Sequence, residues 1–359
     1  MQIKSIILVK ILIGDYMKHN IDLDKYSLRT DLINETIENN KSKIDSKIDE
    51  FDNIKVTSIY LDKENSHLLN KKVGDYITIE FDDITDYENK EKVKNIFIKY
   101  LNKIITKTKI KEKQSCLVIG LGNSKSTPDA LGPLTIENIV VTNHIFMYDE
   151  PNEGFRPVSA FIPGVTGTTG IETSDMIKSV VKSLKPDFLI VIDALASQSL
   201  SRVNKTIQIT NTGIHPGSGV GNSRKEISYE TIKIPVIAIG VPTVVDATVI
   251  VSDTINYMQK HYAFNKDFQK NPMSKLVNSS NINYLKKEIT IKEEDRKKLL
   301  GIIGTLNEYE VRQLIYEVLN PIGYNLMVTP KEVDFVIEKL ADIIGNGINR
   351  TLHKSINNI

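Results

Sequence analysis

Three short apolar runs lie in the centre of the chain, and they constrain the fold more than any other feature of the sequence. They are Cys116–Leu121, Phe188–Ile192 and Pro235–Gly240. Runs of this kind are typical of parallel strands that are buried on both faces of a sheet. A strand candidate at Val158–Ile162 and an amphipathic helix at Thr173–Leu184 separate the first two runs. This order indicates a βαβ unit, so we predict an α/β fold with a doubly wound, mostly parallel sheet flanked by helices.

The segments before these runs predict additional strands at the N-terminal side. Ile54–Leu61 and Tyr76–Phe81 alternate in polarity and are rich in β-branched residues, which is typical of strands. Glu91–Thr106 repeats apolar residues at a helical period. The polar segment 17–52 predicts little order beyond a helix near Leu32–Lys47.

The C-terminal part of the chain predicts helices. Glu308–Leu319 is amphipathic, and a capping box at Thr329–Glu332 opens a second helix. Gly345 and Gly347 are expected to end that helix. The intervening residues 265–298 are rich in Lys, Asn, Ser and Glu, which predicts a variable insertion or linker.

Composition and the chain's N-terminal end exclude several classes of protein. The 46 basic and 45 acidic residues give a net charge of +1, which argues against a dedicated nucleic-acid binder. Cys116, the single cysteine, lies in an apolar run and is interpreted as a buried structural thiol. The apolar residues 3–13 are too few to span a bilayer, and no signal-peptide cleavage site follows them. Residues 1–16 are interpreted as a misannotated start before Met17, because the codons for Gly14-Asp15 can spell a ribosome-binding sequence.

Four loops at the predicted strand ends are dense in glycine, proline and small polar residues. They span residues 120–133, 163–175, 213–228 and 240–247. Glycine lets a backbone approach a ligand closely. Ligands on an open α/β sheet bind outside the carboxyl ends of its strands. The functional site is therefore expected where these loops meet.

Two aspartates in these regions are the candidate catalytic groups. Asp129 lies in the first loop, and Asp193 directly follows the apolar run Phe188–Ile192. Two carboxylates delivered to one place can share a proton and activate a water molecule. An aspartate after a strand is also often a helix cap or a turn former, and Asp129 fits that role equally well. Asp246 ends a similar run and is a third candidate.

Further polar residues of the loops are candidate substrate contacts. His215 fits a loop hydrogen bond as well as a substrate contact. Arg224, Lys225 and Arg156 fit either a solvated surface or the binding of an acidic side chain. The sequence lacks the phosphate-loop pattern G-x-x-x-x-G-K-[ST], the serine-hydrolase pattern G-x-S-x-G and the zinc pattern H-E-x-x-H.

The loop motifs are long enough to indicate a family. They are Gly120–Asn123 with Thr127–Pro133, Gly154–Ala160, Gly170–Asp175, Ile192–Ala196, Ile214–Asn222 and Pro242–Ala247. Together they closely resemble the germination protease (spore protease) family of endospore-forming bacteria. The resemblance runs from about Tyr26 to His353.

This resemblance implies an endopeptidase that initiates degradation of small acid-soluble spore proteins during germination. It implies cleavage after Glu or Asp and before an apolar residue, in the cytoplasm of the forespore and spore core. It also implies a homotetramer with no membrane or direct nucleic-acid partner, and a fold similar to that of hydrogenase-maturation proteases. The family's proposed catalytic aspartates fall on Asp129 and Asp193.

The resemblance further implies a zymogen that processes itself. Residues 17–31 correspond to a propeptide, and the Asp31–Leu32 bond has the acidic and apolar residues of the substrate rule. Cleavage there leaves residues 32–359 as a single α/β peptidase domain. The alternative interpretation of this segment is a helix entry with Asp31 as its cap.

Two alternatives for the function stay open from the sequence. No cofactor is firmly implied, but the same carboxylates also suit a divalent metal, which would make the enzyme a metal-dependent peptidase. The other alternative is a non-catalytic α/β module that binds acidic proteins.

Overall fold

The computed structural model describes residues 30–40, 44–148, 153–217, 224–270, 289–319 and 326–358. The predicted start artefact and nearly all of the predicted propeptide lie outside these residues. The strands are β1 (Ser46–Phe51), β2 (Ile54–Leu61), β3 (Gly74–Phe81), β4 (Cys116–Gly120), β5 (Val158–Phe161), β6 (Phe188–Ser197), β7 (Thr206–Thr210), β8 (Val236–Asp246) and β9 (Met327–Val328). In the described part of the chain they form one nine-stranded sheet, with the order β1-β2-β3-β7-β8-β6-β4-β5 and β9 beside β8.

The sheet has a parallel half and an antiparallel half. Strands β5, β4, β6 and β8 pair in parallel. Strands β7, β3, β2 and β1 continue the sheet in antiparallel pairs. The predicted α/β fold with added N-terminal strands and C-terminal helices is confirmed. The sheet is mixed rather than mostly parallel, because the N-terminal strands and β9 add antiparallel pairs to the parallel core strands.

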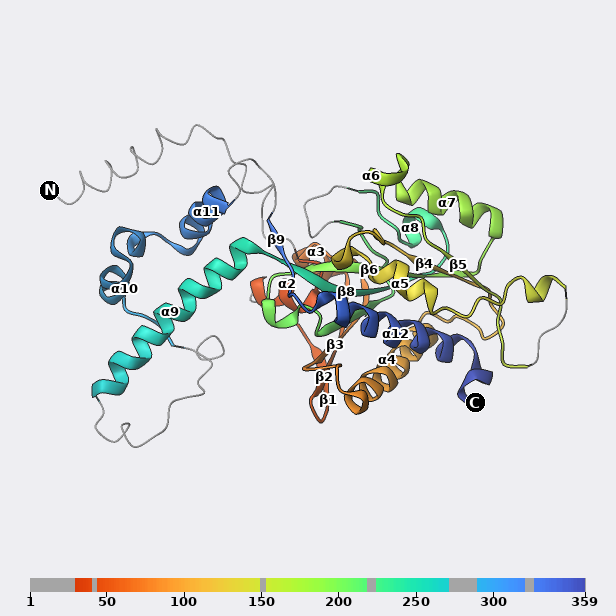
Figure 1. Cartoon of the computed structure of the whole chain (residues 1–359), viewed down its shortest axis with the longest axis horizontal. Helices are drawn as coiled ribbons and strands as arrows, with labels where there is room; N and C mark the ends of the chain where they lie inside the picture. The colour runs from red at the N-terminus through yellow and green to blue at the C-terminus, as the bar shows by residue number, and fades with distance from the viewer. Residues whose placement is uncertain are drawn as a thin grey trace.

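Helices cover both faces of the sheet (Figure 1). They are α2 (Ile33–Asn40), α3 (Lys63–Leu69), α4 (Tyr87–Lys107), α5 (Leu131–Glu137), α6 (Thr166–Thr169), α7 (Thr173–Leu184), α8 (Tyr229–Ile232), α9 (Ala247–Lys270), α10 (Glu293–Leu300), α11 (Glu308–Leu319) and α12 (Val333–Leu352). Helices α4, α5 and α12 pack on one face and form the large core. On the other face, α7 and α8 pack over β4 and β6, while α2 packs over β2 and β3.

Helices α9, α10 and α11 project beyond the sheet (Figure 1). Helix α9 follows β8 directly and continues through residues 265–270 of the predicted insertion. Lys266 of α9 forms an ion pair with Asp295 of α10. Residues 271–288 of that insertion lie outside the described residues. None of the described helices is long and apolar enough to cross a membrane. That residues 32–359 form a single domain stays a prediction.

Several predicted boundaries were wrong, because tertiary contacts override the local signals. Within the segment 17–52, expected to have little order, Ser46–Phe51 forms a strand that pairs with β2. Helix α12 begins at Val333, after the predicted capping box, and continues through Gly345 and Gly347 to Leu352. At Gly347 a β-carbon would collide with the ring of Phe97 on α4. This glycine therefore allows close helix packing and does not end the helix.

Candidate active site

The apolar run Phe188–Ile192 predicted that Asp193 follows the end of its strand. In the structure Asp193 instead lies inside β6. Strand β6 continues to Ser197 because it stays paired with β8, with a register shift between Leu195 and Ala196. The shorter neighbour β4 ends at Gly120, which pairs with Ile192. Asp193 is therefore the first residue of β6 beyond the carboxyl end of β4, and it is only 6% exposed.

Asp129 lies in the loop that follows β4, in the short 3-10 helix Thr127–Asp129. Its carbonyl accepts a hydrogen bond from the Asn123 N–H at 3.0 Å, which closes the loop. Gly122 has a φ of 113°, and a β-carbon there would collide with the Asp129 carbonyl, so the loop requires glycine at this position. The Thr243 hydroxyl donates to the Pro128 carbonyl at 2.6 Å and anchors the loop to β8.

A cavity of about 350 Å³ opens at this end of the sheet. Asp31, Asp129, Asp193 and Arg224 line it. All four glycine-rich loops predicted from the sequence contribute to its wall. The cavity thus brings the two candidate catalytic aspartates, one candidate substrate-binding arginine and the predicted cleavage residue into one place.

Burial and like charge favour the protonated forms of the two candidate catalytic aspartates. Burial raises the pKa of Asp129, while the Asn123 N–H and Arg224 act in the opposite direction. Burial also raises the pKa of Asp193 well above its ordinary value, and the carboxylates of Asp129 and Asp31 raise it further. A pair in this environment holds a proton that an exposed aspartate would lose.

The two remaining basic candidates of the third loop, Lys225 and His215, contact acidic side chains outside the cavity lining. The Lys225 ammonium lies 2.6 Å from an Asp175 oxygen. His215 Nε2 lies 3.2 Å from a Glu226 oxygen. Neither side chain lines the cavity in the described part of the chain. Their predicted role in substrate binding gains no support from this arrangement and stays a prediction.

Arg156 and Asp246 also lie away from the cavity lining. The Arg156 guanidinium is buried, 5.4 Å from the centre of the Phe188 ring. Asp246 accepts a hydrogen bond from the Thr248 N–H at 2.7 Å, at the start of α9. This contact is the helix-capping role that an aspartate after a strand often has.

Asp31 lines the cavity next to the two aspartates, and hydrogen bonds hold it and its neighbour Thr30 in place. The Asp31 carboxylate accepts a hydrogen bond from the Ala196 N–H at 3.2 Å. The Asp31 carbonyl accepts one from Gln208 Nε2 at 3.1 Å. Lys71 Nζ donates to the Thr30 carbonyl at 3.0 Å, and Leu32 is fully buried. Gln208 and Lys71 were not predicted from the sequence. The only sequence signal for Gln208 is the alternation of polarity over Thr206–Thr210.

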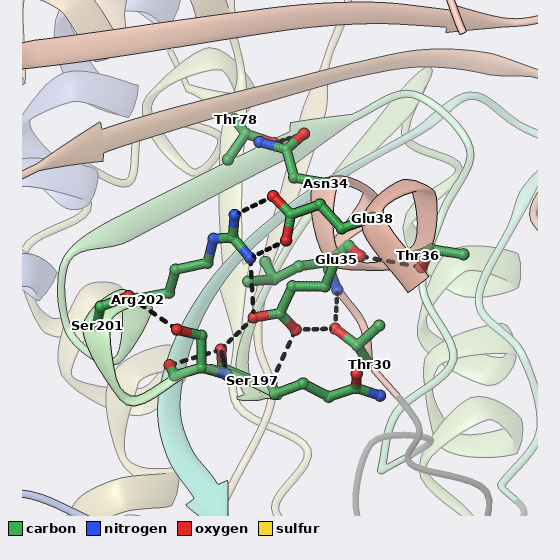
Figure 2. A network of polar contacts seen from close by, with 12 residues as sticks. Thr30, Asn34, Glu35, Thr36, Glu38, Thr78, Ser197, Ser201 and Arg202 are labelled. Atoms are coloured by element: carbon green, nitrogen blue, oxygen red, sulfur yellow. Dashed lines mark hydrogen bonds and ion pairs between the residues drawn. The ribbon is translucent and has the colours of Figure 1, made fainter. Parts of the chain in front are cut away.

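A buried ionic network fixes α2 directly after this segment (Figure 2). The Glu35 carboxylate accepts hydrogen bonds from the Ser197 hydroxyl at 2.5 Å and the Gln198 N–H at 2.8 Å, and also from Thr30. Arg202 Nη1 lies 3.4 Å from the same carboxylate. Ser197 and Gln198 follow Asp193 along the chain, so the network ties the start of α2 to the active-site strand.

Metal binding was tested against the donor groups present. The carboxylates of Asp129 and Asp193 are suitable oxygen donors for a divalent cation. Among the described residues, however, no group of three or more His, Cys, Asp or Glu side chains has an arrangement that could hold a metal ion. The described side chains therefore do not form a site that fits a divalent metal.

Comparison with known proteins agrees with these features. A family model described as germination protease matches residues 24–359. The germination protease of Geobacillus sp. (strain WCH70) is 51% identical over 95% of this chain and 97% of its own length. Those of Priestia megaterium and Bacillus subtilis (strain 168) are 48% and 47% identical, over 95% and 94% of this chain and 97% of each relative. The chain therefore belongs to the germination protease family and is an endopeptidase.

Proposed function

We propose that the chain cleaves small acid-soluble spore proteins after Glu or Asp and before an apolar residue. We assign catalysis to Asp129 and Asp193. The observation that carries this proposal is the presence of Asp31 in the same cavity as the two aspartates, followed by the buried Leu32. Asp31 thus lies in the cavity in the manner expected of a substrate's acidic residue, and the apolar Leu32 is buried directly after it.

Both carboxyl groups have raised pKa values, and their different burial assigns them different roles in the reaction. Asp193 is the more deeply buried and retains the shared proton, which it donates towards the carbonyl of the scissile bond. Asp129 is only half-buried and accepts the proton of the attacking water. Arg224 lowers the pKa of both groups and so offsets part of the cost of the negative charge in the cavity.

The same geometry supports self-processing. Hydrolysis of the Asp31–Leu32 bond releases residues 17–31 as a propeptide and leaves Leu32 as the mature N-terminus. The hydrogen bond from Ala196 to the Asp31 carboxylate supports selection of an acidic residue before the cut. The family resemblance extends the proposal to a homotetramer that acts in the forespore and spore core, which native mass spectrometry and fractionation would test.

Conversion of the purified full chain tests the proposal. We expect N-terminal sequencing after incubation at mildly acid pH to give a new terminus at Leu32. Asp129→Asn and Asp193→Asn should each slow this conversion by about 10²–10⁴-fold, the usual contribution of general acid–base catalysis.

Two results would contradict parts of this proposal. Near-normal cleavage by both variants would exclude the aspartate pair. Loss of wild-type cleavage on chelation, restored by one added metal, would instead favour a metal mechanism on the same carboxylates.

A further inference from the structure

We propose that the side-chain amide of Gln208 holds the substrate main chain on both sides of the scissile bond and stabilises the oxyanion that forms there. This inference rests on the proposed cleavage at Asp31–Leu32 and adds a residue to that reaction. The family resemblance and the sequence motifs gave no role to Gln208.

The register of three strands brings Gln208 to the level of the catalytic aspartate. Asp193 of β6 pairs with Gly240 of β8, and Gly240 pairs on its other side with Gln208 of β7. Residues that pair across a sheet direct their side chains to the same face. Asp193 and Gln208 therefore flank a position without a side chain, about 10 Å apart at two strand spacings.

The contacts of Gln208 match the main chain of a bound peptide. Its Nε2 donates to the Asp31 carbonyl at 3.1 Å, and its Oε1 accepts from the Ile33 N–H at 2.8 Å. The first partner is the carbonyl of the scissile bond, and the second lies one residue beyond the bond. One planar amide thus holds both the Asp31 carbonyl and the Ile33 N–H. Both contacts are to main-chain groups, so they do not depend on the identity of the substrate side chains.

Burial makes these two hydrogen bonds effective. Gln208 is only 6% exposed, and hydrogen bonds are stronger in a medium of low dielectric than in water. When water attacks the Asp31 carbonyl carbon, negative charge accumulates on the oxygen that Gln208 Nε2 already contacts. A donor positioned in advance stabilises that charge without reorganisation. Lys71 Nζ, at 3.5 Å from the same oxygen, is a second donor to it, although burial lowers the pKa of this amino group.

A purely structural role for Gln208 is the competing explanation. Ile33 is the first residue of α2, and its N–H is one of the groups that a helix leaves unpaired. Gln208 therefore also caps this helix. The two roles differ in their consequences, because a cap affects stability alone, whereas a contact with the scissile carbonyl affects the rate of cleavage.

The first experiment measures the self-cleavage rate of the full-length chain carrying Gln208→Met, which keeps the length of the side chain and removes both hydrogen bonds. We expect the rate to fall about 100-fold, as when a protease loses one oxyanion donor. Thr206→Val is the matched control, because Thr206 is buried on the same face of the same strand, and its rate should equal that of the wild type. Thermal unfolding of each variant reports whether the fold is intact.

The second experiment keeps Gln208 and removes only its partner. Ile33→Pro deletes the N–H at the first helical position, where proline is well tolerated, and Ile33→Ala is its control for lost side-chain volume. We expect the proline variant to cleave about 5–10-fold more slowly than the alanine variant, the effect of one neutral hydrogen bond. In the Gln208→Met background the two should cleave equally, because the partner is already absent.

The outcomes separate this inference from the proposed function. If Asp193→Asn is inactive while folded Gln208→Met cleaves at the wild-type rate, Gln208 has no part in the reaction and the function stands. If Gln208→Met does not fold, equal rates for the proline and alanine variants of Ile33 overturn the inference. If the wild type never cuts after Asp31, the proposed self-cleavage itself fails.

Discussion

Replacement of Glu35 tests whether the buried network holds the active-site strand to α2. The Glu35 side chain is 3% exposed and faces Arg202, Ser197 and the Gln198 N–H. Removing one partner of a buried ion pair costs about 3–5 kcal/mol, because the other charge stays buried. Arg202 keeps Glu38 at 2.6 Å and Glu80 at 3.1 Å, so we expect the low end of this range.

Glu35→Ala should therefore lower the free energy of unfolding by about 3 kcal/mol. Glu35→Gln keeps an acceptor for Ser197 or Gln198 and should cost about half as much, in line with one charged hydrogen bond of about 1.5 kcal/mol. Glu38→Ala is the matched control, because its side chain is 60% exposed and pairs with the same arginine. An exposed pair of this kind contributes about 0.2–1 kcal/mol.

Urea unfolding at pH 7 measures these differences, with all variants made in the Asp193→Asn background so that the chain stays intact. The predicted order of cost is Glu35→Ala, then Glu35→Gln, then Glu38→Ala. A cost for Glu35→Ala no larger than that for Glu38→Ala would refute the reasoning, since burial would then contribute nothing to the pair.

Three further predictions concern the buried groups. Because the folded-state pKa of Asp193 is raised, the folded chain holds more protons than the unfolded chain above the ordinary aspartate range, and stability falls as pH rises from about 4 towards that raised value. In the Asp129→Asn background, in which the chain is expected to stay intact, Asp193→Asn should therefore gain stability between pH 4 and 7. A stability difference that does not change with pH would contradict the raised pKa. Gly347→Ala should lower the free energy of unfolding by about 1–3 kcal/mol through its collision with Phe97, whereas Gly167→Ala, with open space around it, should change it little, and equal costs would contradict the packing argument. Burial raises the pKa of the Cys116 thiol, so iodoacetamide at pH 8 should label it only after unfolding, and rapid labelling of the native chain would contradict that burial.

The local sequence pattern predicted the elements well and their ends poorly. The apolar runs of β4, β6 and β8 were recognisable because strands buried on both faces contain almost no polar residue. The extension of β6 to Ser197 was not, because it depends on pairing with β8 beyond the last residue of β4. Gly347 was misread for a related reason, since its meaning depends on a ring of another helix.

The candidate site was predicted in the same uneven way. Asp129 and Asp193 were identified because carboxylates beside apolar runs and glycine-rich loops are chemically conspicuous. Arg156, His215 and Lys225 were equally conspicuous, yet their side chains lie against other partners. A charged residue in a loop does not reveal which neighbour it will meet.

The sequence by itself determined the family, the parallel strands and the two aspartates, because each can be recognised from residues that lie close together along the chain. Only the tertiary structure decided that Asp193, Gly240 and Gln208 form one row across the sheet. It also decided that Asp31 enters the cavity beside them. Strand register and helix docking are set by contacts between distant segments, and these contacts decide which main-chain groups meet at the proposed scissile bond.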